Sequence, residues 1–370
     1  MVKNYFKLIA CFCVCISFIS CASDDDYISN PSSPTPEPVE ISPVIFNIDE
    51  VPYQTLSEYN FFDGVIKDLD PVYGVVPYEL SSPLFSDYAH KKRFIWMPND
   101  VSANYVSDGS IFNFPIGTVL IKNFYFDNVL PTNTTRIIET RLMIKKVEGW
   151  VFANYIWNET QTEAEFDLDG RDVYIQWNEN NITNSVNFRV PSGAECHTCH
   201  KTGDVSIPIG PKPRNINLAF NYGTETKNQI QKWAEMGYLE DNYPSNIGLL
   251  PSWDDESVSL DLRARSYLDI NCAHCHSEES HCAYRPIRFD FESSANPINL
   301  GICVEPDTEI VGAGLTHIVN PGSFDRSVLY YRLNSIEESE RMPLLGRSLK
   351  HQEGVQLIKE WINSLTTQCN

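Results

Sequence analysis

Short runs rich in β-branched and aromatic residues dominate the part of the chain before residue 190. Four of them lie at residues 118–126, 136–147, 150–157 and 173–177, and turn-forming pairs such as Glu148-Gly149 separate several of them. Runs of this length and composition are typical of strands. The pattern therefore predicts an antiparallel, β-rich N-terminal module over residues 44–190.

After Pro191 the spacing of apolar residues becomes helical. Residues 262–270 are expected to form one helix and residues 353–365 another, because apolar side chains in the second segment recur at three- or four-residue steps. Such a stripe is the face with which a helix packs on a core. The fold class predicted from the whole pattern is multidomain, with the β-rich module followed by a mainly α part.

The N-terminus has the pattern of a bacterial lipoprotein export signal over residues 1–21. Lys3 and Lys7 precede an apolar run that is too short to span a bilayer comfortably, and the run ends at Cys21 in a sequence that resembles a lipobox. Cys21 would then be lipidated, although an ordinary secretory signal with an incidental cysteine is the alternative. Residues 22–43 are rich in proline, serine and acids, which predicts a tether. We therefore expect a lipoprotein of the bacterial cell envelope, anchored on the outer membrane and facing either side of it.

The composition is that of a folded, acidic protein. Hydrophobic residues make up 42% of the 370 residues and aromatic residues 12%, which is more than disordered chains carry. The formal net charge of -21 repels nucleic acid, so we expect no nucleic-acid partner. An acidic surface suits basic protein partners, and a merely solvated surface is the other interpretation.

Two segments carry the candidate chemistry, because residues 196–200 and 272–276 both match the motif Cys-x-x-Cys-His. In this motif two thiols one helical turn apart form thioethers with the vinyl groups of a haem, and the adjacent histidine binds the iron. We therefore expect two covalently bound c-type haems with iron. The attachment residues would be Cys196 and Cys199 for the first haem, and Cys272 and Cys275 for the second.

The proximal iron ligands would be His200 and His276, and each iron then needs a ligand on its opposite side. Met342 lies in an extended loop fixed by Pro343 before the last predicted helix, and we expect it to be the distal ligand of the second haem. Met236 lies near the end of another predicted helix. It is either the distal ligand of the first haem or a core residue.

Two other uses of the paired cysteines are weaker. A zinc site built from all four cysteines requires two distant pairs to converge, and it leaves unexplained why a histidine closes both motifs. Dithiol redox chemistry of the thioredoxin kind expects one Cys-x-x-Cys in a βαβ frame, which neither pair has. Haem attachment therefore remains the leading hypothesis.

Three further cysteines lie beyond the motifs, in a protein expected to be exported to an oxidising compartment. We expect a disulfide between Cys282 and Cys303, which leaves Cys369 unpaired at the C-terminus. Spacing alone is compatible with other pairings of these cysteines.

The motifs stand in a longer pattern that resembles known proteins. The segments 262–276, 318–322, 327–332 and 341–343, with the closing helix around Trp361, resemble a class I cytochrome c domain. Together with upstream segments at residues 76–78, 84–89 and 91–94, the pattern over residues 50–365 is similar to an uncharacterised family of bacterial two-haem c-type cytochromes. The resemblance implies a first haem segment at 191–258 and a class I cytochrome c-like domain at 259–370. It therefore implies mainly α cytochrome c-type haem domains, with His276 and Met342 as iron ligands.

The function expected from these features is electron transfer. If both irons have six ligands, the protein is an electron carrier rather than a catalyst, and it exchanges electrons with redox protein partners. One rival is a haem enzyme, peroxidase-like or substrate-oxidising, with an open first haem. Another is a carbohydrate-binding surface lipoprotein, in which the aromatic strand 150–157 lines a sugar site, although such a strand is also typical of a core.

Overall fold

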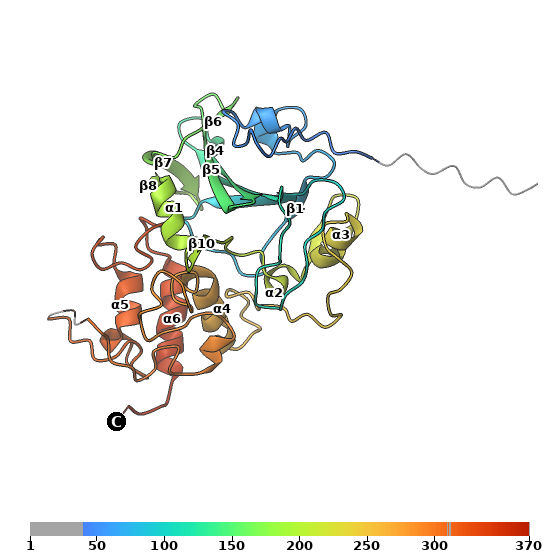
Figure 1. The fold of residues 1–370 in the computed structure, drawn as a ribbon. Coiled ribbons are helices and arrows are strands. Elements are labelled where there is room, and N and C mark those ends of the chain that lie inside the picture. The colour runs from blue at the N-terminus through green and yellow to red at the C-terminus, as the bar shows by residue number, and fades with distance from the viewer. Residues whose placement is uncertain (1–39, 309, 311, 370) are drawn as a thin grey trace, which may run out of the picture. The chain divides into compact units, whose positions relative to one another are not determined.

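An antiparallel sheet of eight strands occupies the chain between residues 76 and 190 (Figure 1). The structure is a computed structural model that describes residues 40–308, 310 and 312–369, and the part from Ile41 onward forms one compact unit. The sheet order is β1-β2-β3-β4-β5-β6, and β7 pairs with both β3 and β8. The strands are β1 Val76–Tyr78, β2 His90–Trp96, β3 Val119–Val129, β4 Thr134–Lys146, β5 Gly149–Trp157, β6 Ala164–Phe166, β7 Arg171–Glu179 and β8 Ile182–Val190.

The two faces of this sheet bury different partners, because successive side chains of a strand point to opposite sides. One face presents residues such as Phe94 and Ile121 to the segment before β1, including Tyr59. The other face presents residues such as Leu120 and Phe152 to the chain that follows the sheet. Both faces of the sheet are therefore covered, and the second face is the one on which the later segments pack.

Six α-helices and two small hairpins follow the sheet in the described residues after 190. The hairpins pair β9 Lys201–Thr202 with β10 Val205–Ser206, and β11 Ala219–Asn221 with β12 Thr226–Asn228. The helices are α1 Gly193–Cys199, α2 Pro213–Ile216, α3 Gln229–Glu235, α4 Leu260–Cys272, α5 Val328–Asn334 and α6 Gln352–Ser364. The two helices predicted from spacing are confirmed as α4 and α6.

Besides the apolar clusters on the two faces of the sheet, a further hydrophobic core lies where α4, α5 and α6 pack together (Figure 1). Trp361 is fully buried there, and its indole N–H donates to Asp261 of α4 at 3.1 Å. Gly354 allows the closest approach of the two longer helices, because a Cβ at this position would lie 2.3 Å from the ring of Tyr267. Tight contact between α4 and α6 thus fixes the end of α4, where the second cysteine motif begins.

The predicted fold class is wrong for the second half of the chain. The part after residue 259 contains three helices of 13, 7 and 13 residues, joined by long loops, so it is not a mainly α domain. These loops are built from turns, which residues 273–327 favour through many Ser, Asn, Pro and Gly residues. The chain is a β-rich protein in which short helices support loops.

The predicted disulfide is also wrong. Cys303 is bonded to Cys369, whereas Cys282 is free. The backbone N–H of Cys282 donates to the carbonyl of Cys275 at 2.9 Å, which keeps Cys282 beside the second motif. The C-terminal segment after α6 instead runs back to Cys303.

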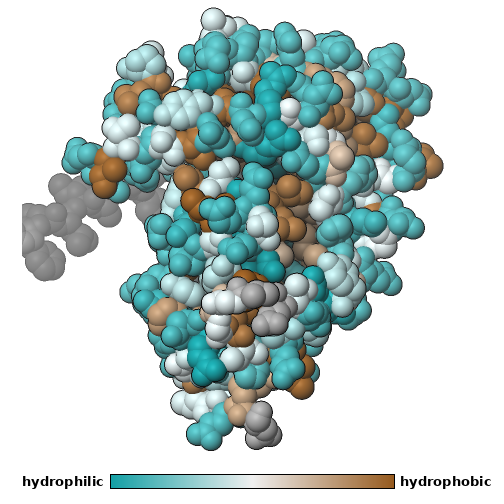
Figure 2. Space-filling view, turned by 90° about the vertical axis from the view of Figure 1, so that its left-hand side faces the viewer, coloured by the Kyte–Doolittle hydropathy of each residue, from teal (hydrophilic) through white to brown (hydrophobic). Residues whose placement is uncertain are grey.

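The export signal, Cys21 and most of the predicted tether lie outside the described residues. Within the described part of the chain, no helix has both the length and the apolar character needed to cross a membrane. Figure 2 shows one face of the molecule, on which polar side chains predominate and apolar ones gather near the middle.

Candidate functional site

The first cysteine motif lies on α1, a short helix with a well-defined start. The hydroxyl of Ser192 accepts from the backbone N–H of Glu195, and the Glu195 carboxylate accepts from the backbone N–H of Ser192 at 2.7 Å. This capping box satisfies amides that a helix N-terminus otherwise leaves unbonded. It holds Cys196, which is buried, and Cys199 one turn apart on the same helix.

His200 is the C-terminal capping residue of this helix, and its imidazole ring is neutral. Burial lowers the pKa of its imidazole to about 3, so the ring is uncharged at neutral pH. Its Nδ1 lies 2.9 Å from the backbone carbonyl of Ile207, which can only accept, so Nδ1 carries the proton. The lone pair of Nε2 is therefore available to a metal, in the arrangement that usually orients histidine ligands.

The second motif begins at the last residue of α4. Cys272 is buried, and the backbone N–H of His276 donates to its carbonyl at 2.9 Å, so the chain turns back after the helix. Burial lowers the pKa of His276 to about 4. Its ring packs edge-on against Phe289, with the two ring centroids 5.5 Å apart. This histidine is thus also neutral and fixed by an aromatic neighbour.

Met342 faces the same cavity as the second motif. The cavity has a volume of about 340 Å³, and Cys272, Cys275, His276 and Met342 all line it. The rest of its wall is largely aliphatic and aromatic, and includes Ile287, Phe289, Ile318, Leu329, Leu333 and Leu345. The structure therefore brings together the predicted attachment cysteines, proximal histidine and distal methionine of the second haem.

Arg347 holds the loop that carries Met342, a role that no motif in the sequence indicates. This buried guanidinium donates to the backbone carbonyl of Met342 at 2.9 and 3.1 Å. It also donates to the carbonyls of Leu333 at 3.2 Å and Ser335 at 2.9 Å. Since one planar group binds several carbonyls at once, it fixes the end of α5 and the Met342 loop against each other.

Met236 lies elsewhere. It caps the C-terminus of α3 and packs with the cluster under the sheet. The cavity beside His200, of about 100 Å³, is lined instead by side chains from β3, β4 and β8, from α4 and from the loop after Met342. Among its described lining residues there is no methionine, but there are two further histidines, His274 and His351.

His351 lines this cavity, and several neighbours hold its ring in place. Its ring stacks on Phe85 at a centroid distance of 4.2 Å, and its Nδ1 lies 3.2 Å from the hydroxyl of Tyr267. Its Nε2 lies 3.6 Å from the Glu353 carboxylate. His274 differs, because its buried Nδ1 has no hydrogen-bond partner and the residue lines both cavities.

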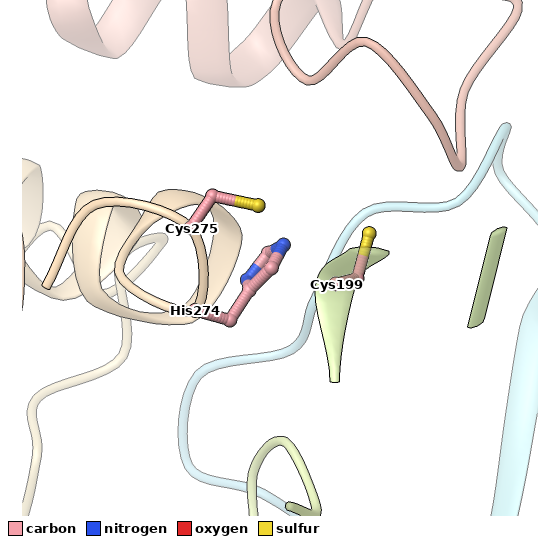
Figure 3. Close-up of side chains that lie close together, drawn as sticks. All are labelled: Cys199, His274 and Cys275. Atoms are coloured by element: carbon pink, nitrogen blue, oxygen red, sulfur yellow. The ribbon is translucent and has the colours of Figure 1, made fainter. Parts of the chain in front are cut away.

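The two motifs meet in space although they are distant in sequence. The ligand atoms of Cys199, His274 and Cys275 all lie within 4.8 Å of one another (Figure 3). Hydrogen bonds from Cys275 and His274 lower the pKa of the Cys199 thiol to about 5, whereas the same sulfur pair and burial raise that of Cys275. The second cysteine of one motif thus lies close to the second cysteine of the other.

The donors fit haem attachment better than a zinc site of four cysteines. Cys196 and Cys272 are outside the group of close ligand atoms in the described chain, so the four sulfurs do not converge on one point. Burial raises the pKa of these two thiols to about 11 and about 12, which favours neutral sulfur in apolar surroundings. An apolar cavity with neutral histidine, thioether sulfur and paired thiols is the donor set that binds c-type haem.

Comparison of the chain with models of protein families, with curated proteins and with solved structures gives no match.

Proposed function

We propose that this protein is an exported, lipid-anchored dihaem c-type cytochrome that transfers electrons through two haems attached side by side. The observation that carries the proposal is the convergence of the two motifs at Cys199 and Cys275, next to a cavity that His276 and Met342 share. A bound haem supplies reversible one-electron chemistry at its iron. Because Cys199 and Cys275 adjoin, the chain would hold the two haems near each other, at a distance suited to electron transfer between them.

The chain contributes attachment, ligation and exclusion of water. The thiols at positions 196, 199, 272 and 275 would form the thioethers, and His200 and His276 would bind the irons. Met342, held by Arg347, would occupy the distal position of the second haem, where a thioether raises the reduction potential relative to a second histidine. The apolar wall of the cavity would raise the potential further, since burial disfavours the more highly charged oxidised iron.

The location and the partners belong to the same proposal. An export signal with a lipidated Cys21 would place the protein on the outer membrane of a bacterial cell envelope. The net charge of -21 then favours docking with basic redox proteins.

Haem content tests the proposal directly. The full chain, matured in a host that attaches c-type haem, should give two haems per chain by the pyridine haemochrome assay, and Cys199→Ala with Cys196→Ala should remove one of them. Cys282→Ser is the matched control and should keep both. A preparation that binds zinc in place of haem would contradict the proposal and would favour a metal site at Cys199, His274 and Cys275.

Met342 is tested separately from haem attachment. Met342→Ala should abolish the near-infrared band of methionine-ligated ferric haem while both haems stay attached. Met236→Ala is the control and should leave the band unchanged, because Met236 packs under the sheet. An unaltered band in Met342→Ala would remove Met342 from the ligands.

A haem enzyme is the second candidate, and one observation favours it. The described residues lining the cavity beside His200 include no methionine, so the first iron has no thioether ligand there. Cyanide binding by the ferric protein and peroxide turnover would support this candidate over the carrier.

Carbohydrate binding by the strand 150–157 has no support. Trp150, Tyr155 and Trp157 are buried, so this aromatic strand belongs to the core.

A further inference from the structure

Three cationic side chains stand side by side on one face of the sheet. The strand register places Arg93 of β2 opposite Lys122 of β3, and Lys122 opposite Arg141 of β4. Directly paired residues of neighbouring strands point to the same face. Like charges in such positions destabilise a sheet, so this row needs compensating negative charge.

The described chain supplies one carboxylate in contact with this row. The Glu139 carboxylate, which is fully buried, accepts from Nε and Nη2 of Arg141 at 2.9 and 2.5 Å. Lys122 has no ion-pair partner within 4.0 Å among the described residues. Arg93 is 7% exposed, and its Nη2 is buried without a hydrogen-bond partner. The row therefore retains excess positive charge.

The pKa values of two lysines reflect this crowding of buried cations. Burial, together with Arg93 and Arg141, lowers the pKa of Lys122 well below its ordinary value. Lys91, on the same face of β2, has its pKa lowered to about 7 by burial and by the same two arginines. Both shifts have the sign expected when buried cations lack an anion.

Two members of the row line the cavity beside the first motif. Lys122 and Arg141 line this cavity together with Cys199 and His200. Both cations lie over the ring of Phe124, with Lys122 Nζ 4.8 Å and Arg141 Cζ 4.3 Å from its centroid. A group attached at Cys199 and ligated by His200 would therefore border these cations.

We propose that Lys122, Arg141 and Arg93 form a carboxylate-binding site that holds a propionate of the first haem. The inference rests on the proposed function, because it requires a haem at Cys196 and Cys199. Haem carries propionate carboxylates as its anionic groups, and arginine and lysine bind carboxylates through charge-assisted hydrogen bonds. A small free carboxylate has the same chemistry, but the haem propionate is brought to this cavity by covalent attachment.

The test is a redox titration of the haem-loaded full chain carrying Lys122→Met. Loss of the cation leaves the propionate charge uncompensated, which favours ferric iron, so one of the two midpoint potentials should fall. We expect about a tenfold change in the reduction equilibrium, which is about 59 mV for one electron. Lys122→Arg keeps the charge and should restore the wild-type potential. Lys92→Met is the matched control, since Lys92 is exposed on the opposite face of the neighbouring strand.

Each outcome decides between the proposal and a specific alternative. If Lys122→Met retains both haems and both potentials, the propionate site is refuted while the proposed function stands. A change in the axial-ligand spectrum would make Lys122 an iron ligand and would also overturn the inference. So would a spectral response of the wild-type protein to added acetate or succinate, because the site would then be open to free carboxylates. Should Lys122→Met fail to fold by circular dichroism, Lys122→Gln provides the same charge change in a polar side chain.

Discussion

Breaking the Cys303–Cys369 disulfide should cost the protein several kcal/mol of stability. The bridge closes a loop with a sequence separation of 66 residues. A cross-link of that span removes enough chain entropy from the unfolded state to contribute about 4 kcal/mol at 25 °C in the loop-closure model. The loop includes α5, the Met342 segment and α6, so the bridge stabilises the part of the chain that surrounds the second motif.

Cys369→Ser is the suitable perturbation, because it removes the bridge near the end of the chain and leaves Cys303 in its native backbone contact. The Cys303 N–H donates to the carbonyl of Val319 at 3.1 Å, and this bond does not depend on the bridge. Denaturant unfolding of the haem-loaded protein, followed by tryptophan fluorescence and circular dichroism, gives the free energy of unfolding. We expect a loss of about 2–4 kcal/mol, the usual range for native disulfides.

Cys282→Ser is the matched control and should change the free energy of unfolding by less than about 1 kcal/mol, because its sulfur is free. If instead Cys282→Ser were the destabilising variant and Cys369→Ser were neutral, the pairing described here would be refuted. Peptide mapping of the oxidised protein by mass spectrometry should independently recover the peptide pair that contains Cys303 and Cys369.

Three further substitutions test how the motifs are supported. Gly354→Ala would raise helix propensity by about 1 kcal/mol, yet it places a Cβ 2.3 Å from the Tyr267 ring, so overpacking of about 1–3 kcal/mol should reduce the net stability measured by denaturation. Ser192→Ala removes the capping box of α1 and should cost about 1 kcal/mol in the same measurement. Arg347→Met leaves the Met342 carbonyl and its neighbours without their donor, which should cost about 3 kcal/mol and weaken the near-infrared methionine band.

Matched variants separate these effects from general sensitivity to mutation. Gln356→Ala changes an exposed residue of α6, and Ser185→Ala an exposed serine of β8, so both should leave stability within about 0.5 kcal/mol of wild type. Arg341→Met removes a guanidinium that makes one long bond, 3.4 Å from Nε to the carbonyl of Leu344. If Arg341→Met weakened the methionine band as much as Arg347→Met, the proposal that Arg347 specifically holds the Met342 loop would be refuted.

Local elements of this protein could be predicted from the sequence, whereas its fold class could not. The four predicted strands are present as β3, β4, β5 and β7, because their β-branched and aromatic residues have a strong local preference. The composition of the loops after α4 favours turns, but it does not specify the path that these loops take. Their conformation depends on contacts such as that of Arg347 with the carbonyl of Leu333 in α5, which only the folded chain brings together.

The candidate site also has one part that could be predicted from the sequence and one part that could not. The motifs at residues 196–200 and 272–276 can be recognised in the sequence because each consists of consecutive residues. The proximity of Cys199 and Cys275 depends on how α1 and α4 pack, so it has no signature in the sequence. The row of cations formed by Arg93, Lys122 and Arg141 depends on strand register and has none either. The prediction for Cys303 was wrong for the same reason: Cys369 at the C-terminus was expected to be unpaired, and its approach to Cys303 depends on the path of the chain after α6.

The burial of Cys196 and Cys272 also sets an order of events during biogenesis of the proposed cytochrome. Thiols at the end of α4 and on α1 that are covered by packed side chains, with pKa values of about 12 and about 11, react poorly with a vinyl group. A chain that folded first would close both attachment points. In the proposed cytochrome, haem would therefore be added while the chain is still open and its cysteines are reduced, so that each haem would become part of the core as that core forms.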